Sequence, residues 1–130
     1  MAADDVFRLV QSMTKNEKRA FNLFLRKEDR DSSFLKLFKL LSHQKEYDEE
    51  QLQSAFEDTS YFDNFSVLKS NLKKEILRCL RHYYESRKSY QEILELLKDA
   101  NILMDKQLHD MAFKRLRKAE KTASEMHHDG

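Results

Sequence analysis

The sequence predicts an all-α fold, a bundle of about seven helices that ends in a repeat-like antiparallel helical hairpin. Proline is absent, and the only glycine is the last of 130 residues. Chains with strands and tight turns rarely lack both, because glycine supplies positive φ angles and proline presets turns. Apolar residues also recur at spacings of three and four along most of the chain, which is the helical period. We therefore expect one all-helical domain at 1–130, with a bundle at 1–88, a hairpin at 89–126 and a frayed tail at 127–130.

Short helices are expected in the first third of the chain. The first covers residues 4–12 and can be capped by an aspartate at position 4 or 5. The second begins at a capping box, in which the Thr14 hydroxyl accepts from the Glu17 amide and the Glu17 carboxylate accepts from the Thr14 amide. A charged break at 28–31 then precedes a third helix, which one of the two serines at 32–33 can cap.

A fourth, shorter helix and a loop follow. Asp48 is a suitable N-cap for a helix at 49–56, whose first residues are acidic and suit the positive end of the helix dipole. Residues 57–63 are expected to form a loop. Its two aromatic residues, Tyr61 and Phe62, are expected to pack back onto the core.

The longest helical pattern, residues 64–87, organises the predicted bundle. Its apolar stripe consists of Phe65, Leu68, Leu72, Ile76, Cys79, Leu80 and Tyr83. Its opposite face carries Lys69, Lys73, Lys74, Arg78 and Arg81. A helix of about 24 residues spans roughly 36 Å. The shorter helices can therefore pack against the stripe as a common wall.

The last two helices are expected at about 90–106 and beyond a tight connection at 107–110. Small residues between large ones give this hairpin the pattern of Leu96, Ala100, Leu103, Ala112, Leu116 and Ala119. The pattern resembles one tetratricopeptide-type repeat, in which small residues let two antiparallel helices approach closely. Gln107 stands in place of the turn glycine, Asp99 in place of an apolar residue and Ser124 in place of the closing proline. An ordinary helical hairpin is the alternative.

A wider resemblance extends from Val6 to Ala119. Residues 12–21 read SMTKNEKRAF, followed by FLKLF at 34–38, YDEE at 47–50 and NLKKEILRCLR at 71–81. This series resembles the N-terminal region of uncharacterised helical-repeat proteins of Bacteroidota-type bacteria. The resemblance implies that the chain is an N-terminal piece of a longer repeat protein, and it brings no catalytic residues.

Charge is balanced overall but unevenly distributed. The 24 basic and 23 acidic residues give a net charge of +1, which provides no global attraction to nucleic acid or anionic lipid. Residues 46–63 carry seven acidic and no basic side chains, whereas residues 111–121 carry five basic and one acidic. Neutralisation within the bundle is one interpretation of this pattern, and a ligand-binding surface is the other.

The reactive residues predict no catalytic, metal or cofactor site and no small-molecule substrate. The five histidines do not pair with other ligands at helical spacing, and one terminal glycine cannot form a phosphate-binding loop. No apolar run approaches the roughly 18 residues of a membrane span, and no signal-peptide pattern is present. The single cysteine, Cys79, is expected to be buried and inert, and this usage suits a reducing, cytoplasmic location.

These patterns predict a non-enzymatic protein–protein interaction module, the N-terminal part of an α-helical repeat scaffold. The candidate partner-binding residues are Lys73, Arg78, Arg81, Lys114, Arg117, Leu108 and Phe113. An apolar edge near Leu103, Leu108 and Phe113 is expected to receive the next repeat or a partner. A further possibility is an enzyme whose chemistry lies in a region that this sequence lacks.

The alternative function is a nucleic-acid-binding regulator. The helices at 49–56 and 65–85 permit a helix-turn-helix interpretation, in which the basic face of the second helix would contact phosphates through Lys69, Lys73, Lys74 and Arg78. Against it, the connection of about eight residues exceeds the usual three or four. This connection is also acidic and would repel a nucleic acid.

Overall fold

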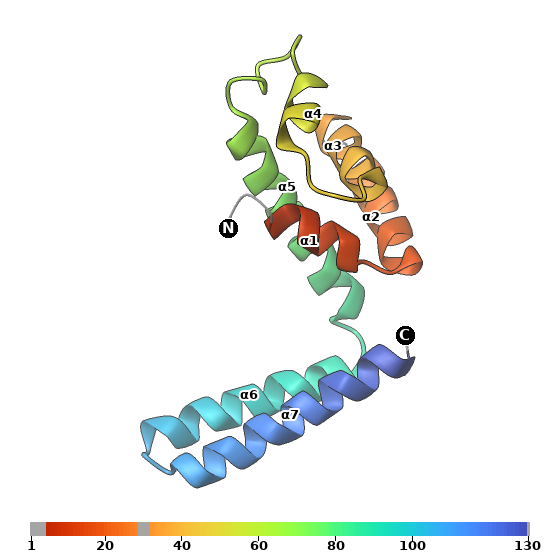
Figure 1. Ribbon diagram of the computed structural model, residues 1–130. Helices are drawn as coiled ribbons and strands as arrows, with labels where there is room; N and C mark the ends of the chain where they lie inside the picture. The colour runs from red at the N-terminus through yellow and green to blue at the C-terminus, as the bar shows by residue number, and fades with distance from the viewer. Residues whose placement is uncertain (1–4, 29–31, 130) are drawn as a thin grey trace. The chain divides into compact units, whose positions relative to one another are not determined.

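The computed structural model describes residues 5–28 and 32–129 and confirms the predicted all-α fold, with seven helices and no strand in those ranges (Figure 1). The helices are α1 (Asp5–Ser12), α2 (Lys15–Lys27), α3 (Ser32–His43), α4 (Glu49–Ser54), α5 (Phe65–Tyr84), α6 (Lys88–Asp105) and α7 (His109–Asp129). The chain forms two compact units, unit 1 (Met1–Tyr83) and unit 2 (Tyr84–Gly130). Each unit is described separately below.

The boundary between the units falls before position 88, where the sequence placed the end of the bundle. Tyr84 belongs to unit 2, and its ring lies against residues that follow it in the chain. The ring centroids of Tyr84 and Tyr90 are 6.4 Å apart, and the Arg87 guanidinium lies 4.9 Å from the Tyr84 ring. These contacts join the last residue of α5 to the first turn of α6.

Unit 1 is built around a single hydrophobic core to which all five of its helices contribute. The buried residues are Val6, Val10, Met13, Phe21, Leu25, Leu37, Phe38, Leu41, Leu52, Phe56, Phe65, Leu68, Leu72, Ile76 and Cys79. The stripe predicted on α5 supplies five of them, so α5 acts as the common wall. At the centre, the Phe21 and Phe38 rings meet edge to face with centroids 4.8 Å apart, a favourable arrangement of aromatic quadrupoles.

Side-chain caps begin two of these helices as the sequence predicts. The Thr14 amide donates to Glu17 Oε1 (2.8 Å) and the Glu17 amide donates to Thr14 Oγ1 (3.1 Å), which completes the capping box of α2. The Gln51 amide donates to Asp48 Oδ1 (3.1 Å) at the start of α4. The expected cap at Asp4 and most of the expected break at 28–31 lie outside the described residues.

The predicted extent of α4 is wrong, because the helix ends at Ser54 rather than at 56. The chain tightens there into a turn in which the Phe56 amide donates to the Gln53 carbonyl (2.9 Å). Lys36 Nζ donates to the Ala55 carbonyl (2.6 Å) and satisfies a group that the helix leaves without a partner. In the loop that follows, Tyr61 packs on the core as expected, but Phe62 remains 39% exposed.

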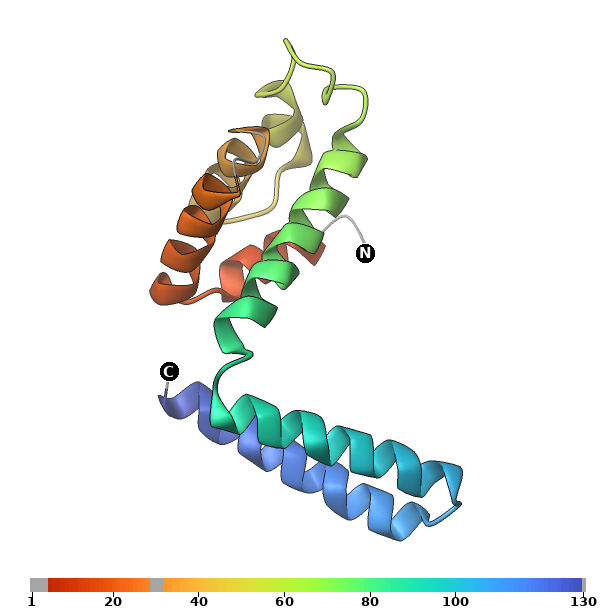
Figure 2. The same ribbon diagram turned by 180° about the vertical axis from the view of Figure 1, so that it is seen from behind.

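Unit 2 is an antiparallel pair, and α6 and α7 lie side by side in both views (Figure 2). Helix α7 continues to Asp129, beyond position 126, where the hairpin was expected to end. Neither proline nor glycine interrupts this stretch, so the helix has no local reason to end at 126. Residue 130 lies outside the described residues.

The turn between α6 and α7 has a left-handed residue where a tetratricopeptide-type repeat has glycine. Gln107 has φ 63°. The Gln107 amide donates to the Met104 carbonyl and the Leu108 amide to the Leu103 carbonyl, both at 2.9 Å. These two bonds form a Schellman motif, in which glycine is the preferred left-handed residue because it has no Cβ.

The variant Gln107→Gly is expected to raise the free energy of unfolding of unit 2 by about 0.5 kcal/mol. Relief of the left-handed strain contributes about 1 kcal/mol or more, and the greater freedom of glycine in the unfolded chain offsets part of it. Thermal unfolding followed by circular dichroism measures the change. The neighbouring variant Lys106→Gly is the control and should be destabilising, because Lys106 has φ −84° and gains nothing from glycine.

Candidate interaction surfaces

Two basic residues of α5, Lys73 and Arg78, have acidic partners within unit 1, whereas Lys74 and Arg81 are exposed. Lys73 Nζ lies 3.5 Å from Asp5 Oδ2 of α1. Arg78 Nη2 lies 3.4 Å from Glu28 Oε1 and Nη1 lies 3.6 Å from Glu75 Oε2. The positive charge of this face is therefore partly neutralised inside the bundle, which leaves less of it for a phosphate backbone.

Lys69 is buried, so its prediction as a solvent-facing residue is wrong. The residue is only 8% exposed. Its ammonium group donates to Tyr47 Oη (3.0 Å) and to Glu49 Oε1, while the Tyr47 hydroxyl donates to the same carboxylate oxygen (3.1 Å). The ammonium also lies 5.4 Å from the Phe65 ring centroid, within cation–π range. The connector before α4 and the first turn of α4 thus cover this part of α5.

The interactions of this cluster shift the pKa values of two of its members apart. The bond from Lys69 lowers the pKa of Glu49 below its ordinary value of 4.5. Burial alone would lower the pKa of Lys69, but its bonds to Glu49 and Tyr47 outweigh burial and raise it. The Glu49 contribution to stability is therefore present above pH 4.5 and is lost as the pH falls through the lowered pKa.

The variant Glu49→Gln is expected to lower the free energy of unfolding by about 1 kcal/mol at neutral pH. Lys69 loses its counter-ion, although the half-exposed carboxylate limits the effect through solvent screening. The difference from the wild type should disappear in acid, where Glu49 is protonated in both folded and unfolded states. Urea unfolding across pH measures it. The control Glu50→Gln removes an exposed carboxylate one residue along and should change stability by less than about 0.5 kcal/mol.

Cys79 is buried as expected, with 3% exposure. Burial raises the pKa of its thiol, and the negative charge of Glu17 raises it further. The thiolate is the reactive form, so both effects make this residue less reactive.

The candidate residues proposed from sequence are divided between the two units. Lys73, Arg78 and Arg81 belong to unit 1, where Arg81 is exposed. Lys114, Arg117, Leu108 and Phe113 belong to unit 2. The structure brings three of these four together, because Phe113, Lys114 and Arg117 line one hollow of about 430 Å³ on α7. Leu108 lies in the connection before α7 and is 40% exposed.

Close packing of α6 on α7 depends on small residues. Ala100, Ala112 and Ala119 are buried between the helices together with Leu96. These are positions that the tetratricopeptide pattern assigns to the contact between two helices. The large position Leu116, in contrast, is 37% exposed.

Unit 2 leaves a stripe of large apolar side chains uncovered. This outer stripe consists of Leu97, Met104, Leu108, Phe113 and Leu116, each between 37% and 52% exposed. Seven residues separate the two α6 members, and three separate the two α7 members, so each pair shares a helix face. His109 Nδ1 lies 3.3 Å from Met104 Sδ, which places the α6 and α7 faces on the same side at the turn.

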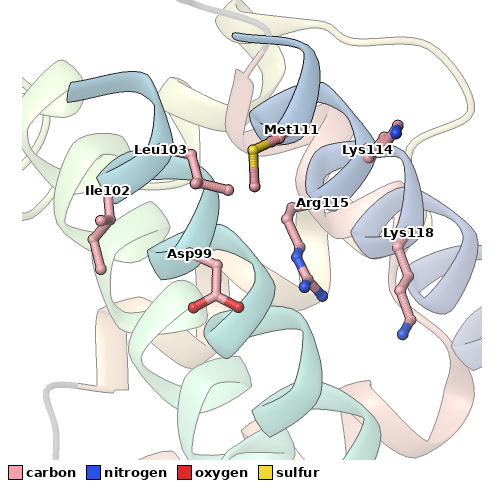
Figure 3. A pocket seen from close by; sticks show the side chains of 7 residues that line it. All are labelled: Asp99, Ile102, Leu103, Met111, Lys114, Arg115 and Lys118. Atoms are coloured by element: carbon pink, nitrogen blue, oxygen red, sulfur yellow. The ribbon is translucent and has the colours of Figure 1, made fainter. Parts of the chain in front are cut away.

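A second surface of unit 2 was missed from the sequence. A groove of about 500 Å³ between α6 and α7, here called the basic groove, is lined by Asp99, Ile102, Leu103, Met111, Lys114, Arg115 and Lys118. Figure 3 shows Leu103 and Met111 facing one another from the two helices, with Asp99 and Arg115 further along them. The signal was present in the spacing of Met111, Arg115 and Lys118, four and then three residues apart, which places an apolar and two basic side chains on one stripe.

Among the residues whose side chains the structure describes, no group of three or more histidine, cysteine or acidic residues is placed to hold a metal ion. Within residues 5–28 and 32–129, no helix combines the length and the apolar composition that crossing a membrane requires. Comparisons with protein families, with curated proteins and with solved structures find no match to this chain.

Proposed function

We propose that the chain is a non-enzymatic protein–protein interaction module, the N-terminal part of an α-helical repeat scaffold. The observation that carries this proposal is the outer stripe of unit 2. A two-helix repeat cannot bury both of its faces, and it is stabilised by packing against a further helix. A contiguous row of half-exposed leucine, methionine and phenylalanine side chains is the surface on which such packing occurs.

The energetics favour an occupied stripe. Full burial of a large apolar side chain contributes about 1.5–3 kcal/mol, and these residues still expose a third to a half of their surface. Covering the remainder is therefore worth about 1 kcal/mol for each side chain. The small residues at the α6–α7 contact and the left-handed Gln107 at the turn support the resemblance to a repeat. The single cysteine supports a reducing, cytoplasmic location for the module.

The nucleic-acid regulator is the less favoured function. It needs a row of available cations on α5, but three of the four predicted phosphate contacts are engaged. Lys69 is buried against Glu49, and Lys73 and Arg78 have carboxylate partners. Anisotropy of labelled duplex and single-stranded oligonucleotides tests it directly. We expect the wild type to show no salt-dependent binding of these oligonucleotides. The Lys73→Glu/Arg78→Glu variant should therefore give the same anisotropy as the wild type.

Affinity capture from cells of the source organism, quantified by mass spectrometry, tests the interaction function. The variant Leu97→Ser/Phe113→Ser removes apolar surface from the outer stripe. The control Leu23→Ser/Val67→Ser removes side chains of unit 1 that are 60% and 50% exposed. Two buried apolar contacts account for roughly a tenfold change in affinity or more, so bound proteins should be lost from the first variant only.

Two results would contradict the proposal. One is equal recovery of the same proteins with the wild type, the outer-stripe variant and the control. The other is no recovery above that of an unrelated helical protein. Circular dichroism of each variant establishes that the helices are intact.

A further inference from the structure

The basic groove combines an apolar floor with an excess of positive charge. Ile102 and Met111, which are 55% and 46% exposed, supply apolar surface together with the half-buried Leu103. Lys114, Arg115 and Lys118 line the groove together with one acidic residue, Asp99. Three cations against one anion leave the groove with a formal charge of +2.

The cations of the groove differ from three of the basic residues of α5 in whether a carboxylate lies beside them. On α5, Lys69, Lys73 and Arg78 each lie within ion-pair distance of a carboxylate. No carboxylate of the described residues lies that close to the three cations of the basic groove. These three side chains can therefore contact a negatively charged ligand without breaking an existing ion pair.

The floor favours a peptide over a nucleic acid. Base recognition on single strands uses aromatic side chains for stacking, whereas this floor is aliphatic and thioether. Asp99, on α6, can accept a hydrogen bond from a peptide amide. Leucine-type side chains fit Leu103 and Met111, and carboxylates complement Arg115 and Lys118.

The dimensions favour a short helix as the occupant. The stretch from Met111 to Lys118 rises by about 10 Å along α7, close to two helical turns. A groove between two packed helices is a natural seat for the ridge of a third. Two apolar anchors at positions i and i+4 would meet the floor, and acidic residues on either side would reach the cations.

We infer that the basic groove binds an acidic amphipathic helix of a partner protein, with apolar anchors on the floor and carboxylates on Lys114, Arg115 and Lys118. The inference deepens the proposed interaction function and rests on it. The two use different surfaces of unit 2, so the outer stripe receives a packing helix while the basic groove selects its ligand by charge.

Fluorescence anisotropy with a synthetic peptide tests the inference. The probe is a labelled helical peptide of about four turns, with leucines at i and i+4 and flanking glutamates. A second probe has lysine in place of every glutamate, and a third is a duplex oligonucleotide. The proteins are the full chain, the variant Arg115→Glu/Lys118→Glu, the variant Ile102→Ser and the control Lys98→Glu/Lys121→Glu, which reverses two exposed charges of unit 2 outside the groove.

We expect the acidic peptide to bind the wild type with a Kd of about 10–100 μM, since the footprint is small. The groove reversal should weaken binding at least about tenfold and Ile102→Ser about fivefold, because one removes the charge match and the other an apolar anchor. The control should bind almost as well as the wild type. The lysine peptide should not bind.

Four outcomes would overturn the inference. They are no binding of the acidic peptide, an equal loss in the control, tighter binding of the oligonucleotide, and self-association of the wild type that the groove reversal abolishes. Such self-association would identify the acidic residues 46–63 of a second copy as the occupant. If the peptide fails while outer-stripe variants still lose captured proteins, only this inference falls. If capture is insensitive to the outer stripe, the proposed function itself falls.

Discussion

The variant Phe21→Ala is expected to lower the free energy of unfolding of unit 1 by about 3–5 kcal/mol, the typical loss for a phenylalanine removed from a packed core. Phe21 has 0% exposure, and its ring lies 4.8 Å from that of Phe38 and 6.3 Å from that of Phe24, centroid to centroid. The substitution removes both ring contacts and leaves a cavity that neighbouring helices can close only in part. A small helical domain has a total stability of about 5–15 kcal/mol, so the substitution would remove a large part of the free energy of unfolding of unit 1.

Urea unfolding followed by far-ultraviolet circular dichroism measures this effect, and amide hydrogen exchange assigns it to unit 1. Leu23→Ala on the same helix is the control. Leu23 is 60% exposed, so its truncation should change stability by less than about 0.5 kcal/mol. Equal effects of the two substitutions would show that α2 does not pack as described.

The variant Ala112→Leu is expected to destabilise unit 2 by about 1–3 kcal/mol, because a larger side chain at a closely packed contact forces the helices apart. Ala112 has 0% exposure and lies between α6 and α7. Leucine has nearly the helix propensity of alanine, so the loss would come from the contact and not from the helix itself. A two-helix unit has little other core to compensate, and faster amide exchange should therefore extend along both helices.

Ser124→Leu is the matched control for this change. It introduces the same side chain on α7 at an exposed position and should leave exchange in α6 unchanged. Hydrogen exchange with mass spectrometry resolves the two units, since peptides from α1–α4 report on unit 1 alone. Slower exchange in Ala112→Leu would contradict the close approach of the two helices.

Features that depend on neighbours in sequence could be predicted. The capping box of Thr14 and Glu17 needs residues three apart, and the buried face of α5 follows from the spacing of Leu68, Leu72 and Ile76. Their chemistry is settled within one or two helical turns. The absence of internal glycine and proline then made the all-α fold nearly unavoidable.

Features that depend on distant residues could not be predicted in the same way. Lys69 is buried only because Tyr47 and Glu49 fold over it from about twenty residues away, and nothing local distinguishes it from Lys73. Arg78 finds Glu28 across 50 positions of sequence. The basic groove required the register of α6 on α7, which brings Asp99 opposite Arg115. Periodicity reveals the face of each helix but not which faces meet.

The burial of the only thiol has an experimental consequence. Cys79 lies in the core of unit 1, and unit 2 contains no cysteine. Alkylating reagents can reach this sulfur only when unit 1 opens. The rate of alkylation therefore reports on the opening of unit 1 and not on that of unit 2. Cys79 is thus a single native probe of local unfolding in the five-helix bundle. A partner that binds unit 2 would slow the alkylation of Cys79 only if its binding also stabilises unit 1 against opening.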